Sequence, residues 1–378
     1  MIKYASQKIT KEDVGAVVAS LKGKFLTQGN LTEKFEKKIS KTVNSKFCLV
    51  MNSASSALLL ACKSLGLNKG DVGWTTTNTF AATANSILLC GAKLDLVDID
   101  ENTFNICSKK LEKKLLNTKK NELPKVLIIV HYGGNPCDLR EIYKLSKRYN
   151  FKIIEDASHA IGSIYNKSYI GSCQYSHITV FSFHAIKVIT SCEGGAIMTN
   201  NKKIFKQIKM MRTNGIIRPE FKKSNKQWYY EQKILGYNFR LNEVQAALGL
   251  SQIKRLKLFI KYRNKIANFY ELKLKHLPIK FQNVKNKSIS SYHLFTIIIK
   301  SQNLRNKLYN FLRTKKIETN IVYIPLYRHP IHRKNFKFSD FPNSEDFYKN
   351  CLSIPMHMNL SKKDLKFIVN SIDNFFRR

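Results

Sequence analysis

A lysine and a serine lie at one apolar segment in a way that could support covalent chemistry. Lys187 follows the predicted strand Thr179–Phe183 and is flanked by Ile186 and Val188. A lysine amine is a nucleophile only when burial or neighbouring positive charge destabilises its ammonium form. We therefore expect Lys187 to be a candidate covalent amine and Ser182, within the strand, a candidate phosphate ligand.

A carboxylate and a histidine follow another apolar segment. Asp156 comes directly after the predicted strand Lys152–Glu155, and His159 lies three residues further on. A carboxylate at a strand end can keep the nitrogen of a heteroaromatic ring protonated, and a histidine can donate to an oxygen on such a ring. Taken alone, Asp156 has a simpler explanation as a helix cap and His159 as a hydrogen-bonded surface histidine.

Small residues form the third segment. Ser53, Ala54 and Ser55 lead from the predicted strand Phe47–Met51 into an apolar stretch that begins at Leu58. Such a turn into a helix exposes backbone N–H groups and the positive end of the helix dipole, which together favour phosphate binding. The alternative is a serine-capped helix that binds no ligand.

The three segments are more informative together than apart. Ligands of open α/β sheets bind at the carboxyl ends of the strands. A phosphate seat, a strand-end carboxylate and a lysine are what a pyridoxal phosphate site requires, because all three must converge on one ring. Spacing alone does not decide, since any single lysine in this lysine-rich chain has a small chance of being catalytic. No metal site is expected.

The alternation of short apolar strands with amphipathic stretches predicts the scaffold. It is typical of an α/β fold with a mostly parallel central sheet sandwiched by helices. Apolar residues at helical spacing predict helices over Leu139–Tyr149 and over one long stretch, Leu241–Ile260. The expected strands are Phe47–Met51, Lys93–Val97, Val126–Val130, Lys152–Glu155, Thr179–Phe183 and Ala196–Thr199.

The pattern changes after the long predicted helix. Strand-like pieces at Tyr292–Ile299 and Glu318–Tyr323 and a final amphipathic helix, Lys362–Phe376, indicate a small α+β domain. The length of 378 residues also favours two domains over one. We expect a large domain over residues 1–255 and a small C-terminal domain over residues 256–378.

Charge is the unusual feature of the composition. The 65 Lys+Arg against 26 Asp+Glu give a formal net charge of +39. Basic chains often bind nucleic acid, but here the basic residues are scattered and lack the aromatic interleaving of a single-strand binder. We expect no nucleic-acid partner; a field of this sign would instead attract a small anionic substrate.

Cysteine usage and hydropathy indicate a cytoplasmic protein. The eight cysteines form no C-x-x-C pair, and several lie within apolar runs, as reduced core residues do. The first ten residues contain no apolar leader core, and no apolar run is long enough to span a membrane. Neither secretion nor membrane insertion is predicted.

Longer motifs carry a resemblance to a known family. In this order along the chain, they resemble the DegT/DnrJ/EryC1/StrS sugar aminotransferases, over nearly the whole sequence. The resemblance implies fold type I and pyridoxal 5'-phosphate as cofactor. The motifs are Leu26–Gly29 with Phe35–Glu36, Thr79–Asn85, Glu155–His159, Phe181–Lys187 with Glu193–Gly195, Gly236–Gly249 and Tyr323–Pro325.

The resemblance also implies roles for the residues around the cofactor. Lys187 would bind it covalently and later move a proton, and Asp156 would keep its ring nitrogen protonated. Phe80 would stack on the ring, and His159 would lie beside the ring hydroxyl. The phosphate would be held by the backbone N–H groups of Ala54 and Ser55 and the hydroxyl of Ser182.

Two further implications concern the partner subunit and the substrate. Asn238 matches a residue that reaches the phosphate of the neighbouring subunit's cofactor, which implies a homodimer with shared active sites. The residues expected to contact the nucleotide sugar are Tyr4, Lys24, Phe25, Leu26, Thr27, Arg240 and Tyr323.

Within the family, the likeness is strongest to transaminases of pseudaminic acid biosynthesis. These aminate a UDP-linked 4-keto-6-deoxy-N-acetylhexosamine to UDP-4-amino-4,6-dideoxy-N-acetyl-β-L-altrosamine, with L-glutamate leaving as 2-oxoglutarate. Val188 and Ser191–Cys192 depart from the common family pattern and leave the substrate open. The alternatives are a family member acting on another UDP-, dTDP- or GDP-linked sugar, a non-catalytic regulator on the same fold, and a nucleic-acid-binding protein.

Overall fold

A seven-stranded sheet forms the centre of the molecule. The structure, a computed structural model, describes residues 1–218 and 228–377. The strand order is β1-β9-β8-β5-β4-β2-β3, and β9 runs antiparallel to the other six strands. The strands are β1 Phe47–Met51, β2 Val72–Thr76, β3 Lys93–Val97, β4 Val126–Val130, β5 Lys152–Asp156, β8 Ile178–Ser182 and β9 Gly195–Thr199.

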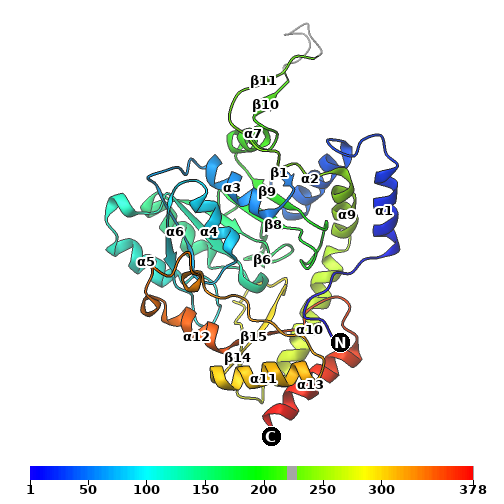
Figure 1. Cartoon of the computed structure of the whole chain (residues 1–378), viewed down its shortest axis with the longest axis vertical. Coiled ribbons are helices and arrows are strands. Elements are labelled where there is room, and N and C mark those ends of the chain that lie inside the picture. Colours follow the sequence, from blue (N-terminus) through cyan, green and yellow to red (C-terminus); the bar gives the residue numbers. More distant parts are fainter. Residues whose placement is uncertain (219–227, 378) are drawn as a thin grey trace.

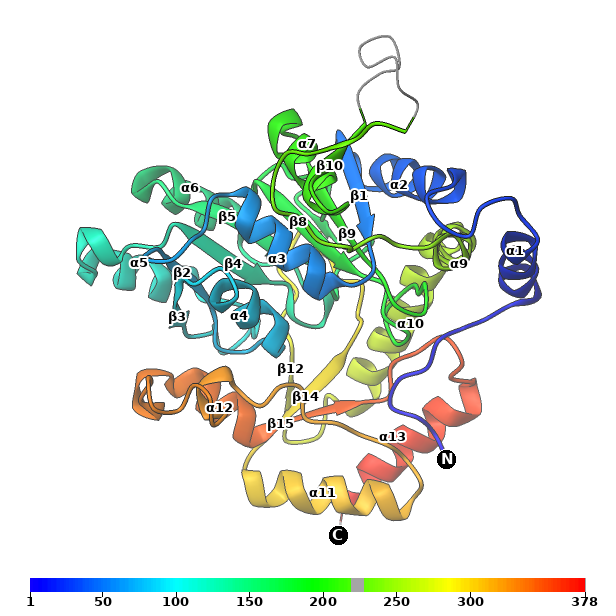
Figure 2. The same cartoon turned by 45° about the horizontal axis from the view of Figure 1, so that its top comes forward.

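Helices cover both faces of this sheet (Figures 1 and 2). All five residues of β4 are buried, and alternate ones enter two different cores, with Leu127 and Ile129 in one and Val126 and Ile128 in the other. Buried apolar runs of this kind are expected for a strand covered on both sides. One face is covered by α3 Ala54–Ser64, α4 Ala81–Leu88 and α7 Lys202–Met211, and the other by α2 Asn30–Val43, α5 Ser108–Asn117, α6 Leu139–Tyr149 and α9 Glu243–Ile253.

The C-terminal part is built around a small antiparallel sheet. Its strands are β12 Ile279–Phe281, β14 Phe295–Ile299 and β15 Cys351–Ile354, in the order β12-β14-β15. The helices α10 Leu256–Leu274, α11 Gln302–Thr314 and α13 Lys362–Phe376 share one core with this sheet. Helix α12 Pro342–Asn350 lies directly before β15. The expected boundary at residues 255 and 256 falls between α9 and α10, and a division into domains there stays a prediction.

The N-terminus lies on this C-terminal part. Ile2 forms a bridge with Ile317, and the Tyr4 N–H donates to Glu318 at 3.2 Å. Helix α1, Lys11–Leu21, then packs against α9 beside the large sheet. Two small sheets complete the fold. One has three strands, β6 Ile164–Tyr165, β7 Ser168–Tyr169 and β13 Ser288–Ile289. The other has two, β10 Ile216–Ile217 and β11 Glu231–Gln232, and extends away from the body of the molecule (Figure 1).

Three expectations about elements need correction. The long helix predicted over Leu241–Ile260 is two helices, because the N–H groups of Lys254 and Arg255 bond three residues back instead of four. Strand β2 was not predicted, since Gly73, Trp74 and two threonines hide the apolar pattern. The segment Glu318–Tyr323 is extended but forms only an isolated bridge, at Asn320.

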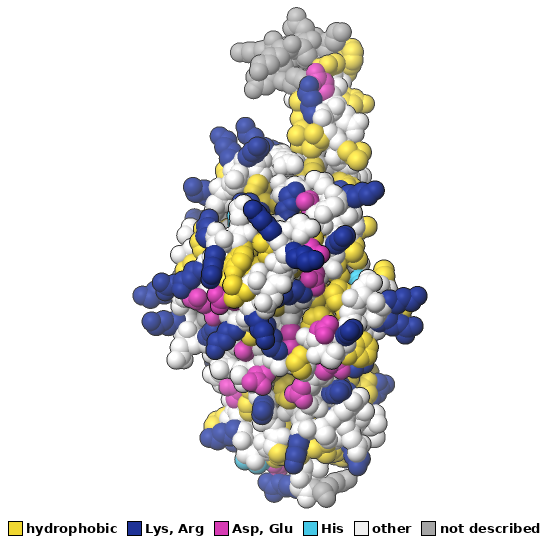
Figure 3. Space-filling model, turned by 90° about the vertical axis from the view of Figure 1, so that its left-hand side faces the viewer, with side chains coloured by type: hydrophobic (Ala, Val, Ile, Leu, Met, Phe, Trp, Pro, Cys, Tyr) yellow, Lys and Arg dark blue, Asp and Glu magenta, His cyan; other side chains and the backbone are white. Residues whose placement is uncertain are grey.

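Surface charge is spread over the molecule. On the face seen in Figure 3, lysine and arginine side chains are dispersed from end to end, with acidic side chains between them. Ion pairs such as Lys110 with Asp98 and Lys114 with Asp95, both at 2.6 Å, neutralise individual lysines locally but leave the net excess of basic residues unchanged. Within residues 1–218 and 228–377, no helix is long and apolar enough to cross a membrane.

Candidate functional site

A cavity of about 380 Å³ lies at the carboxyl ends of β1, β5 and β8. Its lining comes from two parts of the chain, since Tyr323 follows α11 of the C-terminal part while the other lining residues come from the large sheet and its loops. Eight residues expected from the sequence line it: Ala54, Ser55, Phe80, Asp156, His159, Ser182, Lys187 and Tyr323.

Lys187 lies in the loop after β8, and its side chain is partly buried. Loss of contact with water lowers the pKa of its ammonium to about 8, although the charge of Asp156 acts in the opposite direction. Within the part of the chain that the structure describes, no carboxylate forms an ion pair with it. Lys187 can therefore be an uncharged amine near neutral pH, as covalent chemistry requires.

Asp156 ends β5 and is 5% exposed. Its Oδ1 accepts from the Ser158 N–H at 3.1 Å and from the Ser158 hydroxyl at 2.5 Å. Its Oδ2 accepts from the Thr83 hydroxyl of α4 at 2.7 Å. The carboxylate is thus held from two sides while it lines the cavity.

Both ring nitrogens of His159 form hydrogen bonds, one to the large-sheet part of the chain and one to the C-terminal part. Its Nδ1 accepts from the Gly133 N–H at 3.3 Å, and its Nε2 lies 2.9 Å from the Tyr323 hydroxyl. Burial, with the positive charge of Lys187 nearby, holds the pKa of His159 well below its usual value. Since Nδ1 accepts, the proton of the neutral ring is on Nε2, which donates to Tyr323 and leaves the tyrosine proton available for another acceptor.

The N-terminus of α3 borders the cavity at a point suited to an anion. Ser53 caps the helix by accepting from the Ser56 N–H at 3.1 Å. The N–H groups of Ala54 and Ser55 have no acceptor among the described residues. The Ser182 oxygen accepts from the His184 N–H at 3.4 Å, so its proton remains free to donate. Helix dipole, two N–H groups and a hydroxyl are a phosphate-binding set.

Gly195 allows β9 to pass close to the N-terminus of α3. A Cβ at this position would lie 2.5 Å from the carbonyl of Ser53 and 2.6 Å from the Ala54 nitrogen. Strand β9 can therefore run directly beneath the start of α3 only without a side chain here.

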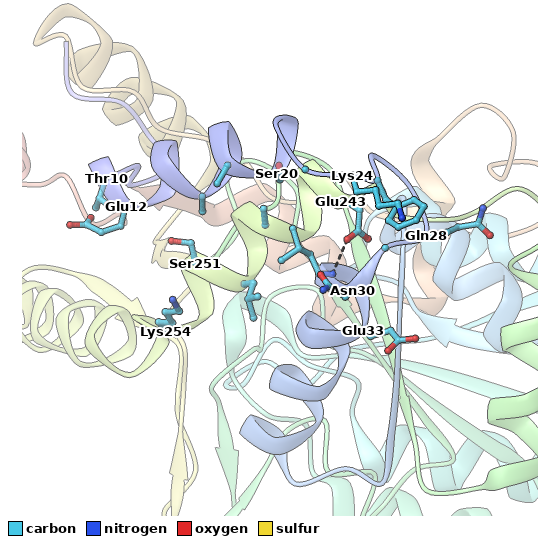
Figure 4. A pocket seen from close by; sticks show the side chains of 18 of the residues that line it. Thr10, Glu12, Ser20, Lys24, Gln28, Asn30, Glu33, Glu243, Ser251 and Lys254 are labelled. Carbon is cyan, nitrogen blue, oxygen red and sulfur yellow. Dashed lines mark hydrogen bonds between the residues drawn. The ribbon is translucent and has the colours of Figure 1, made fainter.

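The remaining expected residues do not line this cavity. Lys24 and Phe25 border a larger hollow of about 1060 Å³ between α1, α2 and α9 (Figure 4). Leu26 accepts from the Glu243 N–H at 2.9 Å, and Thr27 pairs with Asn242. Among the described residues, no aspartate lines this hollow, so we place the chemistry in the smaller cavity, which Lys187 and Asp156 both line.

Asn238, Arg240 and Tyr4 lie elsewhere again. Asn238 is exposed and forms a backbone bridge with Thr213, while Arg240 forms one with Met51, beside the start of α3. Tyr4 packs in an apolar cluster that also contains Tyr323.

Sequence reasoning missed two groups that support the site. Thr79 and Thr83 form a buried hydroxyl chain to Asp156. His293 packs against His159, with ring centroids 4.3 Å apart and ring planes tilted by 41°, and it lies near Lys187. Burial keeps the pKa of His293 well below its usual value. Both threonines lie in the family motif Thr79–Asn85, but that motif assigned a role only to Phe80, and nothing in the sequence around His293 distinguishes it.

An amine, a carboxylate and a phosphate-binding helix N-terminus that line one cavity define a site suited to a phosphorylated pyridine aldehyde. The comparison with known families agrees with this class. The model of the DegT/DnrJ/EryC1/StrS aminotransferase family matches residues 7–373, and the chain belongs to that family.

Individual proteins of known name are similar to the chain over nearly its whole length. The chain is 36% identical over 376 residues to a UDP-4-amino-4,6-dideoxy-N-acetyl-beta-L-altrosamine transaminase of Campylobacter jejuni, covering 98% of this chain and 96% of that protein. Among solved structures, Helicobacter pylori PseC, an aminotransferase involved in the biosynthesis of pseudoaminic acid, matches with a TM-score of 0.92 and 32% identity, covering 100% and 99% of the two chains. The PLP-form of the putative sugar aminotransferase Spr1654 from Streptococcus pneumoniae matches with a TM-score of 0.91 and 25% identity, covering 100% and 98%.

Proposed function

We propose that this chain is a pyridoxal phosphate-dependent transaminase of pseudaminic acid biosynthesis. Its substrate would be a UDP-linked 4-keto-6-deoxy-N-acetylhexosamine, its product UDP-4-amino-4,6-dideoxy-N-acetyl-β-L-altrosamine, and its amino donor L-glutamate. The observation that carries the proposal is the meeting of Lys187, Asp156 and the α3 N-terminus in one cavity. The 36% identity to the Campylobacter jejuni transaminase supports the choice of sugar.

The residues present fit the cofactor. The N–H groups of Ala54 and Ser55, which have no acceptor within residues 1–218 and 228–377, and the hydroxyl proton of Ser182 would hold its phosphate. Phe80, 60% exposed at the cavity, would cover one ring face. When bound, pyridoxal phosphate supplies an electron-withdrawing ring that stabilises negative charge on the carbon losing its proton.

The protein's own groups would manage the protons. Lys187 Nζ, with its pKa lowered to about 8, can both take and return a proton near neutral pH, which suits a base that must later act as an acid. Asp156 would hold a proton on the ring nitrogen, since both its oxygens are fixed by donors. The neutral His159 would keep Tyr323 oriented as a donor into the cavity.

The sugar and the second subunit would complete the site. We place the nucleotide sugar against Tyr323 and Arg240, and against Tyr4 and the Lys24–Thr27 segment of one or the other subunit. In a homodimer, Asn238 would contact the phosphate of the partner's cofactor. Its exposure and its position outside the cavity of its own chain support this assignment.

A spectroscopic test addresses the first half of the reaction. The purified protein, supplied with pyridoxal phosphate, is expected to show the visible band of a lysine-bound cofactor, to lose it on addition of L-glutamate, and to release 2-oxoglutarate. Borohydride before glutamate should fix the cofactor to the peptide containing Lys187. The second half is tested by adding a panel of UDP-, dTDP- and GDP-linked keto sugars and identifying the amino sugar by mass spectrometry.

Replacement of the lysine is the sharpest single check. Lys187→Ala and Lys187→Arg should abolish repeated turnover, because neither side chain supplies a primary amine, while both should still bind pyridoxamine phosphate. The matched control is Lys280→Ala, which changes an exposed lysine on β12 and should behave as the wild type. Repeated turnover by Lys187→Ala would exclude the assigned role.

A further inference from the structure

A chain of buried hydroxyls runs from α4 to Asp156. Thr79 is 2% exposed and Thr83 is not exposed at all. The two hydroxyl oxygens are 2.8 Å apart, and the Thr83 oxygen lies 2.7 Å from Asp156 Oδ2. These contacts link the N-terminal turn of α4 to the carboxyl end of β5.

The direction of this chain is fixed by chemistry. A carboxylate can only accept hydrogen bonds, so the single hydroxyl proton of Thr83 must point to Asp156. Thr83 then has only lone pairs to offer, and Thr79 must donate to it. The opposite carboxylate oxygen, Oδ1, is held by two donors of Ser158 on the same strand end. Thr83 is therefore the described side chain that fixes Asp156 from outside its own loop.

The same threonines also place Phe80. Phe80 is the residue before α4, and its carbonyl accepts from the Thr83 N–H at 3.2 Å. The Thr79–Thr83 contact therefore spans the residue whose ring lines the cavity. One short segment sets the relative positions of an aromatic face and a carboxylate, the two groups that would contact the ring of a flat cofactor.

We infer that Thr83 is a positioning residue that orients Asp156 for the cofactor ring nitrogen, with Thr79 supporting it. This inference rests on the proposed function, because the ring is that of pyridoxal phosphate. A hydrogen bond to a charged group corresponds to roughly a ten- to hundredfold effect on an equilibrium or a rate. Loss of the Thr83 hydroxyl should therefore act on cofactor affinity and on kcat, and leave substrate KM nearly unchanged.

A matched pair of variants tests this. Thr83→Val removes the hydroxyl and keeps the shape of the side chain. The control is Thr75→Val on β2, because Thr75 is equally buried but its hydroxyl donates to the Ile128 carbonyl at 2.8 Å, away from Asp156. For each protein we would titrate the apoenzyme with pyridoxal phosphate, record the absorbance spectrum, and measure kcat and KM for glutamate and the keto sugar.

The expected result is specific to the hydroxyl. Thr83→Val should lower kcat and cofactor affinity by roughly tenfold or more. Thr83→Ser should restore both to within about threefold, since serine supplies the same donor. Thr75→Val should match the wild type in both. If Thr83→Val does not fold, Thr83→Ala removes the same donor without the valine methyl group and replaces it in every comparison.

Two outcomes would overturn the inference. One is a Thr83→Val (or Thr83→Ala) protein that matches Thr75→Val in cofactor affinity and kcat. The other is a Thr83→Ser protein as impaired as Thr83→Val. Either requires an active wild type in the same assays. A wild type that neither binds pyridoxal phosphate nor transfers an amino group would instead refute the proposed function, so the two failures are distinguishable.

Discussion

Lys187 shows how one residue obtains its chemistry from its surroundings. An exposed lysine is almost wholly protonated at neutral pH, whereas burial lowers the pKa of Lys187 to about 8. At pH 7 about a tenth of such a side chain is the free amine, against about one part in three thousand for an ordinary lysine. The neighbouring histidines His159 and His293 are neutral, because burial holds the pKa of each well below its usual value.

A pH profile tests this shift directly. The rate at which the apoprotein captures pyridoxal phosphate should rise about tenfold per pH unit below pH 8 and level off above it, because only the unprotonated amine reacts. Stopped-flow absorbance between pH 6.5 and 10.5 would measure the rate, with N-acetyl-lysine amide as the control whose capture rate keeps rising to about pH 10.4. A protein profile that followed the control would show that Lys187 is not desolvated.

The sequence predicts the residues of the cavity better than the contacts that support them. Asp156 and Lys187 each follow a predicted apolar strand and Ser182 lies near the end of one, and the ends of parallel strands must meet at one edge of the sheet. The direction in which the Thr83 hydroxyl points depends on how α4 is rotated against β5, which no local pattern specifies. The catalytic roles of Lys187, Asp156 and Ser182 are predictions that the variants test.

At the scale of the elements, helices α2 and α9 pack closely behind the cavity. Gly249 of α9 faces Phe35 of α2, and a Cβ at this glycine would lie 2.4 Å from the tip of that ring. The Phe35 ring in turn packs on Phe183, with centroids 5.2 Å apart, and Phe183 lies just before the loop of Lys187. A side chain at residue 249 would therefore push on the segment that carries the amine.

We expect Gly249→Ala to destabilise the protein. Alanine in place of a helical glycine contributes about 1 kcal/mol, but overpacking a fully buried ring costs about 1–3 kcal/mol, so a net loss of up to about 2 kcal/mol in the free energy of unfolding should result. Urea unfolding measures it. The matched control is Gly15→Ala in α1, where no described atom lies within 4 Å of the added Cβ and a gain is expected. Stabilisation by both substitutions would contradict the close contact.

Element boundaries were predicted where local chemistry sets them. Helices α6 and α13 begin and end as expected, since each has a clear apolar stripe, and α13 a capping box at Ser361. The break between α9 and α10 coincides with a long-range contact. Arg255 turns from the helix to bind Asp13 of α1, which is fully buried, at 2.5 and 2.7 Å. A long-range ion pair of this kind leaves no periodicity in the sequence.

At the scale of the whole molecule, the cavity depends on contacts between separate regions. Tyr323, between α11 and α12, bonds to His159 at the end of β5. Residues 2–4 pair with the segment around Ile317, close to Tyr323 in the chain. Movement of the C-terminal part against the central sheet would therefore alter the cavity directly, which suits a site that must admit two different substrates in turn.

The proposed sharing of sites between subunits gives the last prediction. Lys187→Ala should inactivate the chain that contains it, and Asn238→Asp should inactivate the site of the partner, because its carboxylate would repel the cofactor phosphate. In a mixed dimer of these two variants, one site has Lys187 from one chain and Asn238 from the other, and the second site has neither. Co-expression with two tags and tandem purification should yield mixed dimers with about half of the wild-type activity, since one of two equivalent sites is intact. Differently tagged copies of Lys187→Ala alone should stay inactive. Mixed dimers as inactive as either parent would mean that Asn238 acts within its own chain or not at all.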